Sequence, residues 1–228
     1  MKFTKDIIAL PDTGIDSHPI CFARNTSSSN INIKGSFNVK KTLQGEFIAF
    51  GCLHVFASDS DFNKFKTNRP GGNLIIEKEV EFNINGALFK GQIIPDSVIF
   101  GDRHFYGADY CECSVTENLY KTYMRFIKQF DLTLFPERQM KMFGATSKDI
   151  FLFEVKGEAI PTRVNYGQGF QPEYRLFKID PVGTNVNPGD SGSSVYFKKN
   201  GSKDIEIGII IAKSDDSAYM FKLSNLLN

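Results

Sequence analysis

The residue of this sequence with the clearest potential for covalent chemistry is Ser191. It lies in NPGDSGSSVYF, residues 187–197, between Gly189 and Gly192 and directly after Asp190. The same residue types also build ordinary tight turns. A serine hydroxyl becomes a nucleophile near neutral pH only when a base accepts its proton, most often a histidine oriented by a carboxylate. The motif therefore predicts catalysis only if the rest of the chain supplies both partners.

The chain contains three histidines, of which His54 is the strongest candidate for the base. His54 lies in FGCLHVF, after a strongly apolar segment, where a purely structural histidine would need buried polar partners. The setting suits either a partnered core histidine or a base. His18, in the loop-like DTGIDSHPI, is typical of a solvated turn. His104, in FGDRHFYGAD, lies five residues before Asp109 and so could lie near the site, but its setting is more typical of an exposed turn.

Composition restricts the class of protein. The 228 residues are 41% apolar, enough for a sizeable core, and the formal net charge of +1 indicates neither a nucleic-acid partner nor an anionic membrane surface. No apolar run is long enough for a membrane span, and the start MKFTKDIIALPDTG has too short an apolar core for a secretory signal. Four cysteines without zinc-type spacing indicate reduced thiols. We expect a cytoplasmic globular protein that is not secreted.

Short segments rich in Ile, Val and Phe, separated by Gly, Asn, Asp and Pro clusters, predict a mostly β fold. One segment differs, because apolar residues from Leu119 to Phe130 recur at helical spacing, and Ser114 with Glu117 could form a capping box. We predict a helix near residues 115–130 that divides the strands into two groups. The predicted strands lie within residues 47–56, 73–84, 91–100, 149–157 and 205–212.

Two motifs resemble those of chymotrypsin-like serine proteases: GCLHV at 51–55 is similar to the histidine motif and GDSGS at 189–193 to the serine motif, in the same chain order. DYCECSV (109–115) is similar to the aspartate strand of this family, LTLFPE (132–137) to its interlobe segment, and KMFGATS (141–147) to the turn that opens its second barrel. The resemblance implies two six-stranded antiparallel β-barrels with an active site between them.

The same resemblance implies three parts of the chain. Residues 1–115 would form an N-terminal barrel that carries the histidine and the aspartate, and residues 138–228 a C-terminal barrel that carries the serine. Residues 116–137 would connect the two barrels.

The resemblance implies a Ser-His-Asp triad of Ser191, His54 and Asp109, with the N–H groups of Gly189 and Ser191 as the oxyanion hole. Asp131 competes with Asp109, because its DLTLF surroundings look more familiar. Asp109 is preferred because it lies 55 residues after His54, and because Asp131 would leave too few residues to finish the first barrel. No metal and no cofactor are implied.

Substrate choice is implied only by alignment to the family. No histidine follows residue 104, so the Glu or Gln preference of relatives that use a histidine in this region is not implied here. Lys213 would either favour an acidic or polar side chain before the scissile bond or be an exposed lysine at a strand end. The residues implied to line the substrate pocket are Thr184, Asn185, Val186, Ile210, Ile211 and Lys213.

Within the family, the chain looks more like the serine-type main proteases of positive-strand RNA viruses, of the arterivirus and torovirus type. It lacks an IVGG-type start, and Cys52 has no second cysteine to bracket His54, as secreted digestive relatives have. This likeness implies a polypeptide substrate in the host cytoplasm, with the chain's own polyprotein as one candidate. No nucleic acid is required.

Two other functions suit the same motifs: a catalytically silent protease-like module that acts in assembly, and a non-viral intracellular trypsin-like protease. An α/β-hydrolase esterase does not fit. GDSGS is not GxSxG, the histidine precedes the serine, and the alternation of strands and helices is missing.

Overall fold

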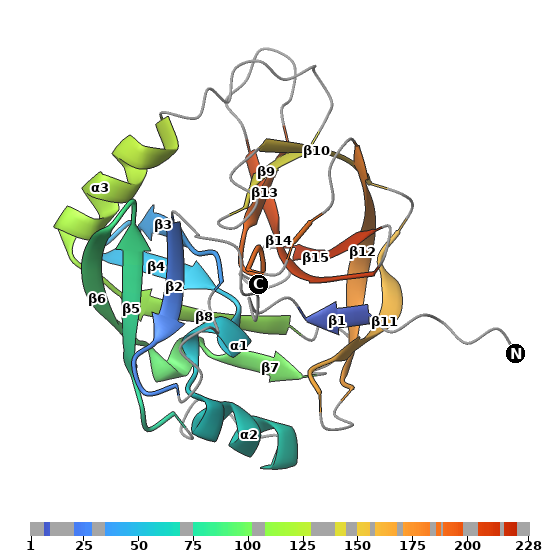
Figure 1. The fold of residues 1–228 in the computed structure, drawn as a ribbon, viewed down its shortest axis with the longest axis horizontal. Coiled ribbons are helices and arrows are strands. Elements are labelled where there is room, and N and C mark those ends of the chain that lie inside the picture. Colours follow the sequence, from blue (N-terminus) through green and yellow to red (C-terminus); the bar gives the residue numbers. More distant parts are fainter. Residues whose placement is uncertain are drawn as a thin grey trace, which may run out of the picture.

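The computed structural model describes residues 7–9, 21–28, 35–68, 75–101, 108–128, 140–144, 150–155, 158–167, 171–182, 186–187, 189–197, 205–214 and 217–222. Within these ranges, most of the regular structure is β-strand, arranged as two largely antiparallel sheets that lie side by side (Figure 1). The mostly β class predicted from the sequence is confirmed.

The first sheet has seven strands in the described residues, in the order β2-β5-β6-β8-β4-β3, with β7 beside β8. Ala23 of β2 also forms an isolated bridge with Gly35, just before β3, so the two ends of the sheet meet. The strands are β2 (Cys21–Asn25), β3 (Asn38–Lys41), β4 (Phe47–Gly51), β5 (Glu79–Ile84), β6 (Ala87–Ile93), β7 (Ile99–Gly101) and β8 (Ala108–Ser114).

The second sheet has eight strands in the described residues, and its ends are joined because β1 pairs with β14 and β12 with β15. The short strand β1, from the N-terminal part of the chain, thus belongs to this sheet, where it pairs in parallel with β11. The division at residues 115 and 137 stays a prediction. The strands are β1 (Ile7–Ala9), β9 (Met140–Phe143), β10 (Ile150–Val155), β11 (Ile160–Asn165), β12 (Glu173–Val182), β13 (Ser194–Phe197), β14 (Ile205–Lys213) and β15 (Ala218–Lys222).

The hairpin of β5 and β6 shows how local sequence sets this architecture. Val80, Phe82 and Ile84 are buried and alternate with partly exposed residues, as the period of two in a strand requires. Asn85 and Gly86 both have positive φ, at 49° and 87°, which suits the tight turn that reverses the chain. The strand predicted within residues 73–84 begins later than expected, because residues 75–78 precede β5 without strand structure. The strand predicted within residues 91–100 is interrupted, because Pro95 begins a 3-10 turn between β6 and β7.

In the part of the chain that the structure describes, three α-helices accompany the sheets: α1 (Leu53–Phe56), α2 (Asp59–Asn68) and α3 (Glu117–Lys128). The predicted helix is confirmed as α3, although Thr116 caps it in place of Ser114, which is the last residue of β8. The predicted strand over residues 47–56 ends at Gly51 and continues as the one-turn helix α1. The sequence analysis did not predict α2. None of the helices within the described ranges is long and apolar enough to cross a membrane.

The larger hydrophobic core joins the two sheets. It contains Phe50 and Phe82 from the first sheet and Leu176 and Ile209 from the second, all buried. The four cysteines are buried and free, and Cys111 and Cys113 lie two residues apart on the same face of β8. Since one core spans both sheets, residues far apart in the chain are held in fixed positions where the sheets meet.

Candidate active site

Asp109 is held inside the first sheet. It lies on β8, pairs with Phe100 of β7 and has no exposed surface. A buried carboxylate must be compensated by hydrogen bonds. One of its oxygens, Oδ1, accepts the backbone N–H of His54 at 3.1 Å, and the other, Oδ2, accepts the ring Nδ1–H of the same residue. These two contacts fix His54 to the end of β8.

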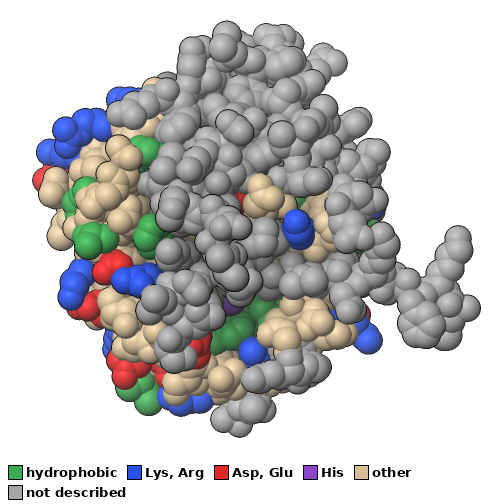
Figure 2. All heavy atoms as spheres, in the orientation of Figure 1, with side chains coloured by type: hydrophobic (Ala, Val, Ile, Leu, Met, Phe, Trp, Pro, Cys, Tyr) green, Lys and Arg blue, Asp and Glu red, His purple; other side chains and the backbone are tan. Residues whose placement is uncertain are grey.

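His54 reaches Asp109 because the chain changes from strand to helix after β4. The single turn of α1 is closed by the Ala57 N–H, which donates to the Leu53 carbonyl at 2.8 Å. All four residues of α1 are buried. His54 is 6% exposed and is the only histidine within the described ranges, and a small area of histidine is visible beside hydrophobic side chains in Figure 2.

Ser191 comes from the second sheet, in the turn that leads into β13. Its Oγ lies 2.9 Å from His54 Nε2, so the imidazole contacts the serine on one side and Asp109 on the other. Because Asp109 accepts the proton on Nδ1, Nε2 is the ring nitrogen that can accept the serine proton. The Ile211 carbonyl, 3.2 Å from Oγ, is an alternative acceptor of that proton. The structure therefore brings the three predicted triad residues together.

Residues just before and within β3 hold the serine turn in place. The Ser36 N–H donates to the Ser191 carbonyl at 2.8 Å and the Ser36 hydroxyl to the Gly189 carbonyl at 3.0 Å, while Asn38 Nδ2 donates to the Gly192 carbonyl at 2.7 Å. Three successive hydrogen bonds thus join the first sheet to the turn. The sequence analysis did not predict these anchors.

Two glycines permit this close approach. Gly192 has φ of +95°, and a Cβ at this position would lie 2.1 Å from the Ser36 carbonyl oxygen. A Cβ on Gly144 would lie 2.2 Å from Asp190 Oδ1, and the other oxygen of Asp190 accepts the Asn187 N–H at 2.9 Å. Glycine is therefore required at both positions by the packing around the serine turn.

The predicted oxyanion hole lies in the same turn. Gly189 has φ of +93°, which allows the sharp reversal before Ser191. The hydrogen bonds that Ser36 and Asn38 make to this turn occupy its carbonyl groups. No described residue accepts a hydrogen bond from the N–H of Gly189 or Ser191. The role of these two groups as the oxyanion hole stays a prediction.

Cys52 is a further polar neighbour of the serine. Its Sγ lies 3.6 Å from Ser191 Oγ and donates to the Ile210 carbonyl at 3.4 Å. The ligand atoms of Cys52, His54 and Asp109 lie within 4.8 Å of one another, a cluster that could hold a metal ion. However, burial and the charge of Asp109 raise the pKa of the Cys52 thiol well above its ordinary value, and both nitrogens of His54 already have partners. The thiol stays neutral in the protein as described, so it is a poor nucleophile.

The residues implied to line a substrate pocket have different positions. The side chains of Val186, Ile210 and Ile211 are buried. Ile210 and Ile211 contact the site through their backbone carbonyls, which accept from Cys52 and Ser191. Lys213 is partly exposed, and its ammonium donates to the Val186 carbonyl at 3.0 Å. The other predicted or rejected candidates lie outside the described residues, namely His18, His104, Asp131, Thr184 and Asn185.

Sequence reasoning also missed a tyrosine that contacts the triad. Tyr166, just after β11, donates its hydroxyl to Asp109 Oδ2 at 2.8 Å. No local pattern in YGQG, which follows β11, indicates a partner 57 residues away in the first sheet.

No family model and no curated protein matches this chain. The solved structures that match this chain include two proteases. One, described as "A glutamic acid specific serine protease utilizes a novel histidine triad in substrate binding", is 14% identical over 90% of this chain and 93% of that chain, with a TM-score of 0.52. The other, "Crystal structure of Rv3671c protease, inactive form", is 11% identical over 96% and 95%, with a TM-score of 0.48. The likeness to the glutamate-specific enzyme shows that this chain has the chymotrypsin-like protease fold.

Proposed function

We propose that this chain is a serine endopeptidase that uses Ser191, His54 and Asp109. The contact that carries the proposal is the 2.9 Å approach of Ser191 Oγ to His54 Nε2, with Nδ1 of the same ring bonded to the buried Asp109. A serine, an imidazole and a carboxylate in this sequence of contacts form a nucleophile with its base and the group that orients the base.

The arrangement supports hydrolysis in two stages. Ser191 Oγ attacks the carbonyl carbon of a peptide bond while His54 Nε2 takes the hydroxyl proton. The resulting oxyanion accepts hydrogen bonds from the N–H groups of Gly189 and Ser191. Collapse of this intermediate breaks the C–N bond, and His54 gives its proton to the leaving amine. A water molecule, deprotonated by His54, then cleaves the acyl ester and restores Ser191.

Labelling with a fluorophosphonate tests the proposal, because only an activated serine reacts rapidly with it. The wild-type chain should be labelled at Ser191, and Ser191→Ala should not be labelled. His54→Ala should slow labelling by several orders of magnitude and Asp109→Asn by about 10⁴-fold, with all three variants folded. A wild-type chain that is folded but unlabelled would indicate a silent binding module and overturn the proposal.

The finer role that we propose is cleavage of a viral polyprotein in the host cytoplasm. It is supported by the resemblance of GCLHV and GDSGS to viral main proteases and by four free, buried thiols, which suit a reducing compartment. The reading frame that surrounds this chain tests the role. A frame that encodes viral replication proteins on either side supports it, and a frame that encodes a self-contained cellular protein contradicts it.

We propose an acidic side chain before the scissile bond of the substrate. Lys213 lies two residues after Ile211, whose carbonyl contacts Ser191 Oγ. The Lys213 ammonium donates to the Val186 carbonyl. No carboxylate of the described residues forms an ion pair with Lys213.

A further inference from the structure

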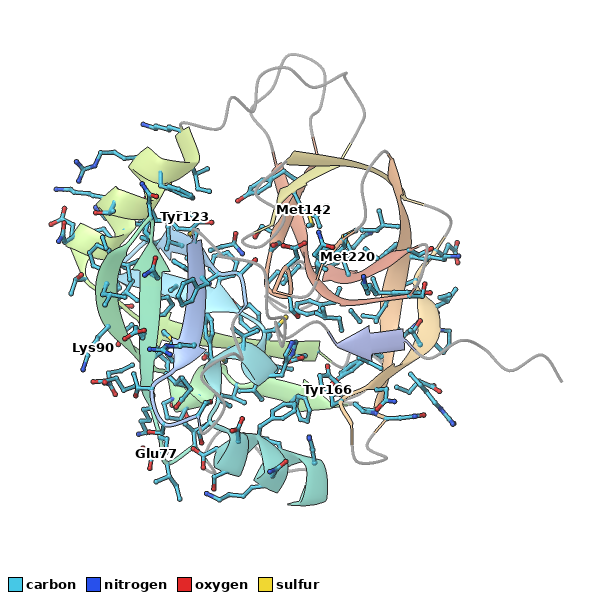
Figure 3. The ribbon with its side chains drawn as sticks, viewed as in Figure 1. Glu77, Lys90, Tyr123, Met142, Tyr166 and Met220 are labelled. Atoms are coloured by element: carbon cyan, nitrogen blue, oxygen red, sulfur yellow. The ribbon has the colours of Figure 1, made fainter. Side chains whose placement is uncertain are left out.

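We propose that Tyr166 is a positioning residue of the triad, one that makes the alignment of Asp109 depend on contact between the two sheets. The proposal rests on the proposed serine hydrolase function and adds a fourth member to its machinery. Tyr166 follows β11 in the second sheet, whereas Asp109 lies on β8 in the first, and the hydroxyl donates to Oδ2 at 2.8 Å. Figure 3 shows Tyr166 at the boundary between the two sheets.

Tyr166 adds a third described hydrogen bond to Asp109. The carboxylate accepts the backbone N–H of His54 on Oδ1, and both the ring Nδ1–H of His54 and the Tyr166 hydroxyl on Oδ2. The two donors from His54 come from the first sheet and share one short helix. The phenol is thus the described donor that reaches the carboxylate from the second sheet.

A second phenol lies beside the Tyr166 hydroxyl. The Tyr174 hydroxyl of β12 lies 3.2 Å from the Tyr166 hydroxyl. A phenol carries one proton, and an ionised carboxylate has none to give, so Tyr166 donates to Asp109 and Tyr174 donates to the Tyr166 oxygen. The oxygen of Tyr174 accepts the Gly101 N–H of β7 in turn. Such a chain of donors strengthens each hydrogen bond within it.

Both phenols keep their protons. Burial, followed by the charge of Asp109, raises the pKa of Tyr166 and of Tyr174 well above the ordinary value of 10.0. Neither hydroxyl ionises over the pH range in which a histidine acts as a base, so Tyr166 remains a donor throughout.

The Tyr166 ring also orients the base. It packs edge-on against the His54 imidazole, with centroids 5.6 Å apart, and contacts the rings of Phe62 and Phe100 at 5.5 and 5.7 Å. These aromatic contacts limit rotation of the imidazole about its side-chain bonds. The ring holds His54 while the hydroxyl holds Asp109.

Tyr166→Phe tests the role of the hydroxyl, because it keeps the ring and removes one oxygen. Loss of a hydrogen bond to a charged group should lower kcat by about tenfold or more, and a residue that acts only by positioning the triad should leave KM unchanged. The matched control is Tyr110→Phe, which removes another buried phenol bonded to a carboxylate, Glu112, at 2.6 Å on the same strand as Asp109. It should leave kcat unchanged.

Double-mutant analysis separates positioning from a general loss of stability. If Tyr166 acts through Asp109, Tyr166→Phe should cause no further loss of kcat in the Asp109→Asn background. The downfield proton NMR resonance of His54 Nδ1–H should shift in Tyr166→Phe and stay in place in Tyr110→Phe. Additive losses of kcat, or an unshifted resonance in Tyr166→Phe, overturn the proposal. The resonance also reports on Tyr166 in a wild-type chain that no fluorophosphonate labels, so failure of the proposed function is recognised separately.

Discussion

The groups that surround the nucleophile are kept neutral by burial. Desolvation, followed by the charge of Asp109, raises the pKa of the Cys52 thiol and of the Tyr166 and Tyr174 phenols. None of them therefore adds a second negative charge beside the carboxylate. When His54 becomes an imidazolium during catalysis, Asp109 is the carboxylate of the described residues that contacts it. The reactivity of Ser191 thus depends on the protonation of its neighbours as well as on its own base.

Lys213 provides a residue-scale prediction about specificity. Lys213→Met keeps most of the side-chain length and removes the charge that we propose to bind an acidic substrate. The wild-type enzyme should cleave a peptide with Glu before the scissile bond faster than the same peptide with Gln, and Lys213→Met should lower this kcat/KM ratio by about tenfold. An unchanged ratio in Lys213→Met would place the specificity elsewhere.

Asp61 supports a residue-scale prediction about stability and pH. Its buried carboxylate accepts the Lys64 ammonium at 2.7 Å and the N–H groups of Ile76 and Glu77 at 2.9 and 2.8 Å. Desolvation raises the pKa of Asp61, but the hydrogen bonds from Lys64 and the backbone outweigh it and hold the pKa below 3.8. Because the folded-state pKa is the lower one, this stabilisation is present above about pH 3.8 and is lost as pH falls through the folded-state value.

Asp61→Asn should accordingly lower the free energy of unfolding by about 1–3 kcal/mol at neutral pH, measured by urea denaturation. The difference from wild type should shrink as the pH falls below about 4. Asp96→Asn is the control, because Asp96 is exposed and its replacement should change little at either pH. A difference between Asp61→Asn and wild type that is equal at neutral and acid pH would contradict the account.

At the scale of elements, the serine turn depends on glycine for space as well as for backbone angle. Gly192 and Gly45 share a positive φ, +95° and +90°, but a Cβ on Gly192 would meet the Ser36 carbonyl at 2.1 Å, whereas nothing lies within 4 Å of one on Gly45. The two glycines therefore separate the effect of backbone strain from that of crowding.

Gly45→Ala should destabilise the protein by about 1 kcal/mol, the cost of the left-handed conformation alone. Gly192→Ala should cost about 3 kcal/mol or more, because the Ser36 backbone must also move. It should abolish labelling of Ser191, while Gly45→Ala is labelled as wild type. Equal losses of stability and of labelling in the two variants would show that crowding is unimportant. Thermal unfolding and fluorophosphonate labelling provide the two measurements.

At the scale of the whole molecule, the site forms because the two sheets are joined. Substitution of Asn38 tests whether this connection is needed. Its Nδ2 donates to the Gly192 carbonyl across the boundary, whereas Asn25, another buried amide, donates to Phe56 and Glu77 carbonyls within the N-terminal half. Asn38→Ala and Asn25→Ala should each lower stability by about 1–3 kcal/mol. Asn38→Ala should slow Ser191 labelling far more than Asn25→Ala does. Similar labelling rates in two equally destabilised variants would argue against the cross-sheet anchor.

The sequence by itself determined the features that local pattern encodes. Alternating burial in β5, the Asn85-Gly86 turn and the helical spacing of α3 all follow from neighbours within a few residues. The serine and histidine motifs could likewise be identified by their resemblance to a known family, and spacing favoured Asp109 over Asp131 without settling the choice. Local pattern failed at α1, because a buried one-turn helix and the end of a buried strand are both short apolar runs.

Only the tertiary structure decided which distant groups meet at Ser191. Tyr166 lies 57 residues from Asp109 in the chain, Asn38 lies 154 from Gly192, and Cys52 lies 139 from Ser191, yet each pair is in contact. Periodicity specifies which face of an element is buried, but it carries no information about which side chain of another sheet meets that face. That partner is set by the packing of one shared core between the two sheets, which places phenol, amide and thiol around the same serine.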